Sequence, residues 1–520
     1  MDRIEPKIGK DVIESLTLGM YEDSRFIYRE YIQNSADQID KAICNGLISE
    51  QEGTIYIFID QDKRKIIIED NATGIPQKEF LPILQNIAQS TKIRGKDKGF
   101  RGIGRLGGLA YCQKLTFESS YFGEDQKSIM IWDAATLKGI INNREVKEEA
   151  VDVLKKITEH KIEDELSQSH FFRVILENVT NEELLNIPNV RRYLEMVVPI
   201  EFKTSFIFKS EICSFLKNKN INLDVYKIYV NGEQIFKGYN TYVYESSKDG
   251  RKNRVDEVID IRTIYEFNEK DELLFWGWYS ITERNQKMNQ INYQRGFRLR
   301  KANIQIGDEY ALSKLFKEER FNHYFFGEIH AVHQDLIPNA RRDYFIENQT
   351  LCEFENKLKA HFVKISKFCY QCSEVNSVRK SLQDYPQKID EIKKKEGIGF
   401  IDKNDAKKTE EELIKIKDEY LRAQKKIAKM KTDYENDLEN PIISILKRLE
   451  NEQNLGKNNI NVETNKFEID VVKPKYLTDN LSRLNKYERK LVSKIFSIIN
   501  DVLDEKTARN LIKKIEESLK

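Results

Sequence analysis

The order of elements in the first 120 residues is the feature that most constrains the fold. Apolar residues recur at helical spacing from Val12 to about Cys44. Two runs rich in β-branched residues follow, Thr54–Asp60 and Lys65–Glu69, and they predict a hairpin. Helical spacing returns at Phe80–Ala88, and a glycine-rich stretch then leads into a further strand at Leu115–Ser119. This order of helix, hairpin, helix and glycine-rich loop predicts an α/β domain.

The first predicted helix carries three polar residues on one face. Glu30, Asn34 and Asp37 stand at positions i, i+4 and i+7. A carboxylate one turn from a carboxamide can serve two parts of a nucleotide site, because Glu30 can polarise a water while Asn34 offers an oxygen to Mg²⁺. A solvated polar stripe is the alternative interpretation of this spacing.

The end of the predicted hairpin holds a second candidate group. Asp70 closes a strand that runs directly into the turn Asn71-Ala72-Thr73-Gly74. Its carboxylate can accept a hydrogen bond from an exocyclic amine, and Gly74 allows the backbone to approach a base or sugar. An Asx-type turn that merely closes the hairpin is the alternative.

The glycine-rich stretch from Gly99 to Gly108 is the third candidate segment. Its glycines expose backbone N–H groups, and a helix that starts at Arg105 would present further donors to an anion. No strand immediately precedes the loop, which argues against a dinucleotide-binding Rossmann turn. The segment is therefore expected to hold phosphates.

In this order, the three segments resemble the superfamily of ATPases that includes gyrase, the ninety-kilodalton heat-shock chaperones, histidine kinases and MutL (GHKL). The resemblance implies a Bergerat-type α/β sandwich that binds ATP with Mg²⁺, and Glu30 as the residue that drives hydrolysis. Asn34 would reach Mg²⁺ through the bound ATP. The nucleotide-binding residues that the resemblance implies are Asn34, Asp37, Asp70, Asn71, Gly74, Ser90, Thr91, Lys98, Gly99, Arg101, Gly102, Ile103 and Gly104.

The chain departs from the family pattern at two positions. Ala72 replaces the first glycine of the second motif, which slightly crowds the turn. The threonine that the family carries on a later strand has no clear match, since the best candidate strand offers Phe172 instead. The water network beside the adenine is therefore the least supported part of the predicted site.

Further segments look most like the heat-shock chaperone branch. Arg29–Gln38 is similar to the first motif of that branch, and Asn86–Thr91 resembles the segment before its lid. Asp335–Asp343 is similar to the middle-domain loop that delivers an arginine to the γ-phosphate, which makes Arg342 the first catalytic candidate and Arg341 the next. Surface ion pairs of these arginines with neighbouring aspartates are the alternative. Microrchidia-type ATPases share the same plan and remain a rival family.

The chain is too long for a single core, so several domains are expected. We assign residues 1–190 to the ATP-binding domain and 200–350 to a second α/β domain of the middle or transducer type. A helical connector is expected over 351–386, a coiled coil or helical hairpin over 387–440, and a helical region over 441–520. The heptad seam runs through Leu413, Ile416, Tyr420, Ala423, Ile427, Met430 and Tyr434, and Pro441 is expected to stop it.

The composition of the chain limits its expected compartment and its expected binding partners. The 86 Lys and Arg residues nearly cancel the 85 Asp and Glu residues, so no overall basic field indicates nucleic acid or an anionic membrane. The sequence shows no signal-like apolar core and no run near the length that crosses a bilayer. The six cysteines are scattered, and Cys369-Tyr-Gln-Cys372 is an isolated pair in a helical pattern, so a metal or redox role is the minor alternative. A cytoplasmic protein without a membrane partner is predicted.

Three functions compete at this point. The first is a homodimeric, ATP-hydrolysing clamp of the heat-shock type that closes its N-terminal domains around a protein client. The second is a nucleic-acid clamp of Microrchidia or MutL style, within prokaryotic defence against phage, so nucleic acid stays open as a partner. A histidine phosphotransferase ranks last, because no histidine is followed by the acidic residue typical of a phosphoacceptor. His330 and His333 lie in a predicted strand region, where i and i+3 face opposite sides, so packing is expected of them.

Overall fold

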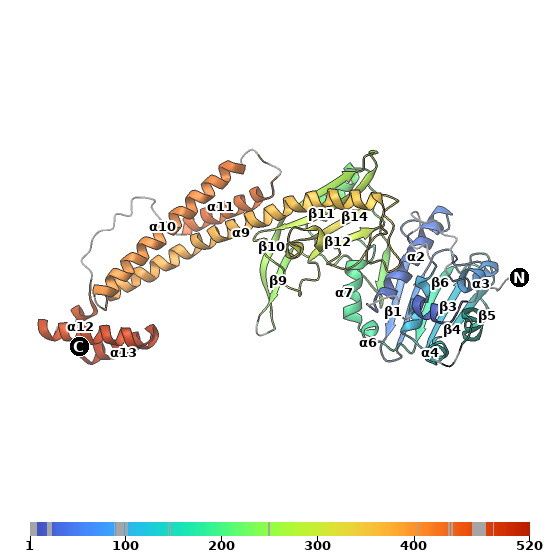
Figure 1. Cartoon of the computed structure of the whole chain (residues 1–520), viewed down its shortest axis with the longest axis horizontal. Helices are drawn as coiled ribbons and strands as arrows, with labels where there is room; N and C mark the ends of the chain where they lie inside the picture. The colour runs from blue at the N-terminus through green and yellow to red at the C-terminus, as the bar shows by residue number, and fades with distance from the viewer. Residues whose placement is uncertain are drawn as a thin grey trace, which may run out of the picture. The chain divides into compact units, whose positions relative to one another are not determined.

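The computed structural model describes residues 8–17, 23–87, 89, 98, 102–143, 145, 147–247, 250–401, 403–434, 437, 440–459, 475–481 and 483–519. The chain divides into two compact units, Met1–Ser366 and Lys367–Lys520. The elements of each unit are labelled in Figure 1.

An eight-stranded sheet forms the first half of the first unit, with strand order β5-β4-β3-β6-β2-β1-β7-β8. Its strands are β1 (Thr54–Asp60), β2 (Lys65–Asp70), β3 (Lys114–Ser120), β4 (Gln126–Asp133), β5 (Thr158–Asp164), β6 (Phe171–Glu177), β7 (Lys227–Val230) and β8 (Glu233–Gln234). The helices of this half are α1 (Asp11–Thr17), α2 (Phe26–Cys44), α3 (Gln77–Gln85), the 3-10 helix η1 (Gly104–Ala110), α4 (Ala134–Asn142), α5 (Ala150–Ile157), α6 (Glu182–Leu185), α7 (Ile187–Val197) and α8 (Lys209–Asn218).

The sheet buries one face against helices. Alternate residues of its strands, such as Ile55 and Ile57 of β1, belong to one core with Ile32 and Ala36 of α2. On the opposite face Tyr56 and Phe58 are about half exposed. This two-layer arrangement follows from the period-2 pattern of the strands and the apolar stripe of the helix.

The predicted α/β class and the α/β sandwich at the N-terminus are confirmed. The first sheet extends beyond the predicted domain boundary near residue 190, because β7 pairs in parallel with β1 and β8 pairs with β7. The partner of so short a strand is a strand far away in the sequence, and a local sequence pattern does not reveal such a partner. Helix α4 and strands β4 and β5 were likewise not predicted.

A six-stranded sheet forms the second half of the unit, in the order β13-β12-β14-β11-β10-β9. Its strands are β9 (Tyr242–Ser246), β10 (Lys252–Phe267), β11 (Leu273–Thr282), β12 (Gly296–Lys301), β13 (Ile304–Gln305) and β14 (Phe326–Ala331). The short 3-10 helices η2 (Ser313–Leu315) and η3 (Glu319–Tyr324) connect β13 to β14. Strand β11 is rich in aromatic residues.

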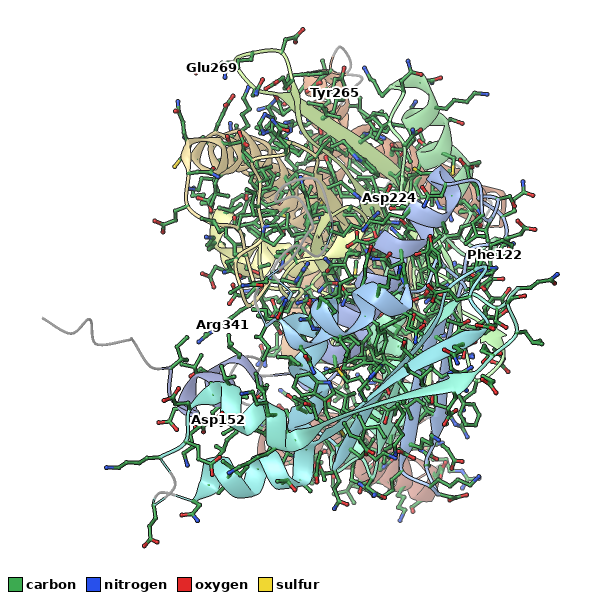
Figure 2. The ribbon with its side chains drawn as sticks, turned by 90° about the vertical axis from the view of Figure 1, so that its right-hand side faces the viewer. Phe122, Asp152, Asp224, Tyr265, Glu269 and Arg341 are labelled. Carbon is green, nitrogen blue, oxygen red and sulfur yellow. The ribbon has the colours of Figure 1, made fainter. Side chains whose placement is uncertain are left out.

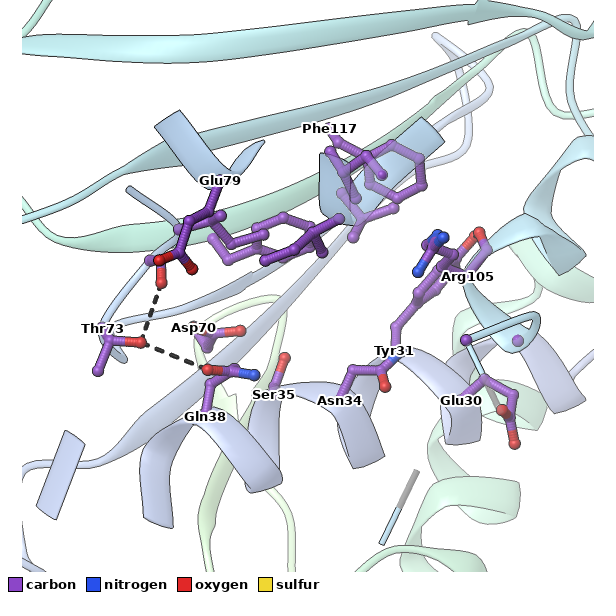
Figure 3. A pocket seen from close by; sticks show the side chains of 18 of the residues that line it. Glu30, Tyr31, Asn34, Ser35, Gln38, Asp70, Thr73, Glu79, Arg105 and Phe117 are labelled. Atoms are coloured by element: carbon purple, nitrogen blue, oxygen red, sulfur yellow. Dashed lines mark hydrogen bonds between the residues drawn. The ribbon is translucent and has the colours of Figure 1, made fainter. Parts of the chain in front are cut away.

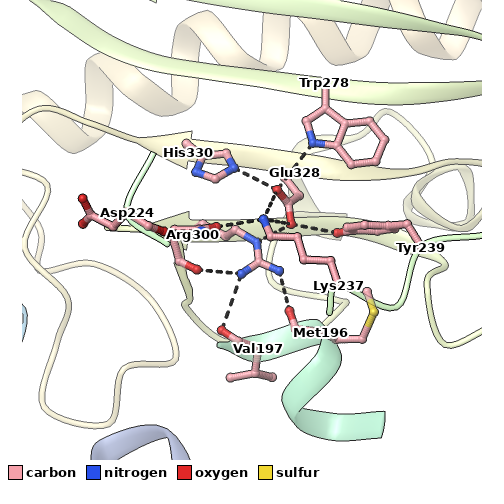
Figure 4. Close-up of polar contacts among 10 residues, drawn as sticks. Met196, Val197, Asp224, Lys237, Tyr239, Trp278, Arg300, Glu328 and His330 are labelled. Carbon is pink, nitrogen blue, oxygen red and sulfur yellow. Dashed lines mark hydrogen bonds and ion pairs between the residues drawn. The ribbon is translucent and has the colours of Figure 1, made fainter. Parts of the chain in front are cut away.

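A fully buried ion cluster joins this sheet to the end of α7 (Figure 4). The Glu328 carboxylate lies 2.7 Å from Lys237 Nζ and 2.6 Å from Arg300 Nε, and Arg300 also donates to the Met196 carbonyl of α7. Burial alone would raise the pKa of Glu328, but Arg300 and Lys237 hold it well below its ordinary value. One carboxylate thus pairs with both buried basic side chains and fixes the sheet against α7.

The two histidines noted in the sequence take part in packing and hydrogen bonds. His330 stacks on Trp276 with ring centroids 4.0 Å apart and contacts Glu328, while His333 lies 3.0 Å from Glu272. Among the residues that the structure describes, no group of three or more His, Cys, Asp or Glu side chains is arranged to hold a metal ion.

The second unit is helical. It contains the end of α9 (Gln349–Ile398), α10 (Lys403–Tyr434), α11 (Ile442–Asn459), the 3-10 helix η4 (Leu477–Asn480), α12 (Lys486–Val502) and α13 (Glu505–Leu519). None of the described helices combines the length and apolar character that a membrane span requires.

Helices α9 and α10 form an antiparallel hairpin within the chain. Gln371 donates to the Tyr434 hydroxyl at 2.6 Å, and Tyr385 stacks on Tyr420 with ring centroids 4.1 Å apart. The hairpin alternative of the sequence prediction therefore describes this segment. Helix α9 runs straight through Pro386, where the helical connector was expected to end, and α11 begins directly after Pro441.

Candidate functional site

A cavity of about 740 Å³ opens beside α2 in the first unit (Figure 3). Such a volume lies within the range that holds small molecules and cofactors. Residues from α2, the β2 turn, α3, the glycine-rich segment, β3, β6 and the loop at 340–342 contribute to its lining. The cavity therefore gathers segments from distant parts of the sequence, including all three predicted motifs.

Helix α2 presents Glu30, Asn34, Ser35 and Gln38 to the cavity. Glu30, Asn34 and Gln38 lie on one face because they are four residues apart, as predicted for Glu30 and Asn34, and Ser35 lies next to Asn34. Figure 3 shows their side chains along successive turns of this helix. Asp37 is buried but is not part of the lining, and its carboxylate accepts the backbone N–H of Lys98 at 3.0 Å.

Asp70 forms a buried polar end of the cavity. Only 1% of the residue is exposed. Its carboxylate accepts the Ala72 N–H at 3.2 Å and a hydrogen bond from Ser35, yet burial raises its pKa to about 7. Leu84, Phe117 and Val174 supply apolar walls of the same cavity. A buried carboxylate among apolar walls is suited to accept from an amine of a planar ligand.

The turn after Asp70 requires glycine at one position and tolerates alanine at another. Gly74 has φ +66°, and a Cβ there would lie 1.9 Å from the Ser120 carbonyl oxygen. Ala72 is fully buried but is not among the described residues with positive φ, so its methyl group adds no backbone strain. Asn71 bridges Thr54 N–H and the Glu52 carbonyl, each at 2.8 Å, and is not part of the lining. Asn71 thus holds the strand ends together, which explains its position without a ligand.

The glycine-rich segment approaches the site carboxylate closely. Gly102, Ile103 and Gly104 line the cavity, and a Cβ on Gly104 would lie 2.0 Å from Glu30 Oε2. The expected helix after the loop is the short 3-10 helix η1, which begins at Gly104. The predicted residues Ser90, Thr91, Gly99 and Arg101 lie outside the described residues.

Lys98 points away from the cavity, contrary to its predicted role as a nucleotide-binding residue. Its ammonium group forms ion pairs with Asp40 and with Asp224, the latter at 3.3 Å, and donates to the Tyr226 hydroxyl at 2.8 Å. Burial would lower its pKa, but these acidic partners raise it. The lysine thus ties the glycine-rich segment to α2 and to the segment before β7.

Arg342 is the residue that joins the second half of the unit to the site. Its Nε lies 2.8 Å from Glu30 Oε1, and its Nη2 donates to the Lys98 carbonyl at 3.1 Å. The residue adopts φ +56°, an uncommon conformation for a non-glycine residue that indicates a constrained loop. Arg341 is exposed, does not line this cavity and lies at the surface in Figure 2. The two arginines, of which the sequence resemblance ranks Arg342 before Arg341, thus occupy different positions in the structure.

Several lining residues were not predicted, and Arg105 and Phe172 are two of them. Arg105 lines the cavity, donates to the Asn86 carbonyl at 2.8 Å and has its pKa lowered to about 10 by burial. Phe172 occupies the expected threonine position and pairs in register with Asp70, so Ser35 of α2 supplies the nearest hydroxyl to that carboxylate. The serine follows Asn34 directly in the sequence, but only the strand register brings it to Asp70.

The family comparison agrees with this geometry. Residues 24–166 match the family model described as histidine kinase-, DNA gyrase B-, and HSP90-like ATPase. This segment is a GHKL-type ATPase domain. The matched range contains α2, the β1–β2 hairpin, η1 and β3, which supply most of the cavity.

The curated relatives are chaperones named HtpG. The chain is 29% identical over 182 residues to the protein of Wigglesworthia glossinidia brevipalpis, covering 30% of this chain and 28% of that protein. It is 25% identical over 196 residues to the Paraburkholderia xenovorans protein, covering 34% and 31% respectively. For Escherichia coli K12 the identity is 27% over 144 residues, covering 24% and 23%. The chain thus spans less than a third of the length of these relatives.

The raised pKa of Asp70 predicts a pH-dependent stability. Between the ordinary pKa of 3.8 and about 7, the folded protein keeps a proton that the unfolded chain has lost, so the free energy of unfolding falls as pH rises through this window. The free energy of unfolding falls by at most about 4 kcal/mol across this window. Asp70→Asn removes this decrease, because asparagine does not titrate. Thermal unfolding of the nucleotide-free protein should therefore show a larger gain in Tm for the variant at pH 8 than at pH 5.

The exposed Asp125 provides the matched control. Asp125→Asn should change Tm by the same small amount at both pH values. A Tm difference between Asp70→Asn and the unmodified protein that is equal at pH 5 and pH 8 would contradict the assigned shift.

Proposed function

We propose that the cavity binds ATP with Mg²⁺ and that the protein hydrolyses the nucleotide. The arrangement of one buried carboxylate at one end and a carboxylate–guanidinium pair at the other is the observation that supports this. Asp70 would accept the adenine amine, and the glycine-rich segment at Gly102–Gly104 would face the phosphates. The absence of a Cβ at Gly104 leaves room beside Glu30 that a larger residue would fill.

Asn34 is suited to contribute an oxygen to Mg²⁺, since it lines the cavity one turn after Glu30. The ion, when bound, would neutralise charge on the phosphate oxygens. Asn34 and the phosphates themselves are hard oxygen ligands, which is the donor set that Mg²⁺ prefers. The residues present therefore fit an ion that is held mainly by the nucleotide.

Glu30 acts on the attacking water in this proposal. The carboxylate accepts a proton from water as its oxygen attacks the γ-phosphorus, and the bond from that phosphorus to the β-phosphate oxygen breaks to release ADP and phosphate. Arg342 stabilises the charge that develops on the transferred group. Its guanidinium already lies 2.8 Å from Glu30, so the short displacement to a neighbouring phosphate is geometrically accessible.

The same contact supports a switch. In the structure, Glu30 is paired with Arg342, so its carboxylate is engaged by a cation. A γ-phosphate competes for that guanidinium and frees Glu30 for the water. ATP would thereby act on the loop that carries Arg342 and convert nucleotide state into a conformational change of the clamp type.

Two substitutions separate hydrolysis from binding. Glu30→Gln removes the base and Arg342→Ala removes the charge stabilisation, so each should lower the kcat for ATP by at least about a hundredfold. Both should keep the Kd for a non-hydrolysable ATP analogue within a few-fold of the unmodified protein. Steady-state phosphate release and equilibrium titration measure the two quantities.

Arg341→Ala is the matched control for Arg342→Ala, because the neighbouring side chain is exposed and lies outside the nucleotide cavity. Its kcat should stay within a few-fold of the starting value. Undiminished turnover by Glu30→Gln, or equal loss in the two arginine variants, would be inconsistent with the mechanism.

We also propose that the chain forms homodimers through α12. The inner face of this helix packs Val492, Phe496 and Ile499 into the small C-terminal core. Its outer face exposes a second apolar stripe at helical spacing, with Leu491 61%, Ile498 62% and Val502 74% exposed. A helix that is apolar on two faces indicates a partner for the second face, and a second copy supplies a matching stripe.

A chaperone-like clamp that acts on protein clients is the activity we infer for the dimer. The similarity of this chain to proteins named as chaperones supports it. The near-balance of 86 basic and 85 acidic residues favours a protein client over nucleic acid.

The dimer prediction is tested by charge insertion in the exposed stripe. Ile498→Asp should shift the mass measured by light scattering from twice the 61.3 kDa chain mass to a single chain. Ile414→Asp on α10 is the control, since Ile414 is also about half exposed but belongs to another helix. A dimer that survives Ile498→Asp, or a monomeric starting protein, would contradict the assignment.

A further inference from the structure

A second cavity, of about 570 Å³, lies in the first unit on the other side of Arg342. Residues of α2, α7, β12, β13 and the loop at 341–343 take part in its lining. Seven of the lining residues are arginines and four are acidic, so the cavity carries an excess of positive charge. We refer to it as the arginine cleft.

Two of these arginines are buried and share one carboxylate. The side chains of Arg295 and Arg298 are 8% and 7% exposed, and their guanidinium groups lie 3.7 Å and 3.4 Å from Glu309. The Nε of Arg298 has no hydrogen-bond partner among the described residues. A buried guanidinium without full compensation is costly, which indicates that the cleft is built to receive an anion.

Arg192 of α7 adds an uncompensated charge at the rim. It is exposed, and among the described residues its contacts are with neutral groups: it donates to the Tyr293 hydroxyl and to the Pro188 carbonyl. Its guanidinium also lies over the Tyr293 ring, 5.0 Å from the centroid. These contacts orient the side chain without neutralising it, so the charge stays available to a ligand.

We propose that the arginine cleft binds a small, multivalent phosphate-bearing anion. Several guanidinium forks around one space match the tetrahedral oxygens of a phosphate, and a bounded cavity suits a small anion better than an extended polymer. An excess of three positive charges among the lining residues favours a multivalent anion over a single carboxylate. The site is separate from adenine recognition at Asp70 and does not depend on ATP hydrolysis.

A ligand bound in the arginine cleft can act directly on the nucleotide cavity. Arg342 lines both cavities, and it is the residue that contacts Glu30. An anion in the cleft attracts the same guanidinium that Glu30 holds. The ligand would therefore shift the position of Arg342 and with it the readiness of Glu30 to act.

The experiment is a calorimetric titration of pyrophosphate into the full-length chain that has been saturated with a non-hydrolysable ATP analogue. Saturation keeps pyrophosphate out of the nucleotide cavity. One equivalent should bind, and Arg192→Glu should weaken that binding about tenfold or more, since it reverses a charge at the rim. Arg192 is exposed, so the variant is expected to fold.

Arg191→Glu is the matched control, because it makes the same charge change at the adjacent position of α7. Arg191 pairs with Glu233 and does not line the cleft. Its pyrophosphate affinity should stay within about twofold. If the analogue fails to bind, the proposed ATP site fails, yet the different response of the two variants still reports on the cleft.

Parallel titrations identify the source of the anion. Inorganic phosphate and pyrophosphate that bind more tightly than AMP indicate a free anion, and the reverse order indicates a phosphorylated small molecule; both support the cleft. No saturable binding at millimolar concentration, or equal weakening by Arg191→Glu and Arg192→Glu, overturns the proposal. Binding of a single-stranded oligonucleotide without any binding of pyrophosphate also overturns it, in favour of a nucleic-acid surface.

Discussion

The contact between Glu30 and Arg342 is the interaction on which the account of the site depends. One partner lies on α2, and the other lies in the loop that follows β14 of the second sheet. Both side chains are about nine-tenths buried, so their attraction is screened far less than that of a surface pair. The two halves of the unit, which fold around separate sheets, are thereby also joined at the site itself. A ligand that attracts Glu30 or Arg342 therefore also acts on the contact between the two halves of the unit.

The roles of the surrounding residues follow from the contact between Glu30 and Arg342. Gly104 leaves space beside the Glu30 carboxylate that no other residue could leave, and the Lys98 carbonyl holds a second nitrogen of Arg342. Asp70 lies at the opposite end of the same cavity, buried and prone to keep its proton. The cavity therefore has one end suited to an uncharged, amine-bearing base and one end suited to phosphate charge. An anion bound in the arginine cleft would also attract Arg342.

Sequence patterns predicted the parts of this site that depend on residues close together in the chain. Helical spacing placed Glu30 and Asn34 on one face, and the β-branched runs predicted the hairpin that ends at Asp70. The motif resemblance ranked Arg342 ahead of Arg341, and in the structure Arg342 contacts Glu30. Lys98 and Asn71 illustrate the limit, since their partners Asp224 and Glu52 come from other segments and could not be found by spacing. The place of β7 in the first sheet was hidden for the same reason, because parallel pairing joins strands far apart in the chain.

A double-mutant cycle between Glu30 and Arg342 tests the central claim most directly. The cycle compares thermal unfolding of Glu30→Gln, Arg342→Met and the double variant in nucleotide-free protein. The account predicts non-additive shifts in Tm, equivalent to a coupling of about 1–3 kcal/mol, and a smaller coupling once a non-hydrolysable ATP analogue is bound. Additive shifts without nucleotide would show that the two side chains do not interact and would contradict the account.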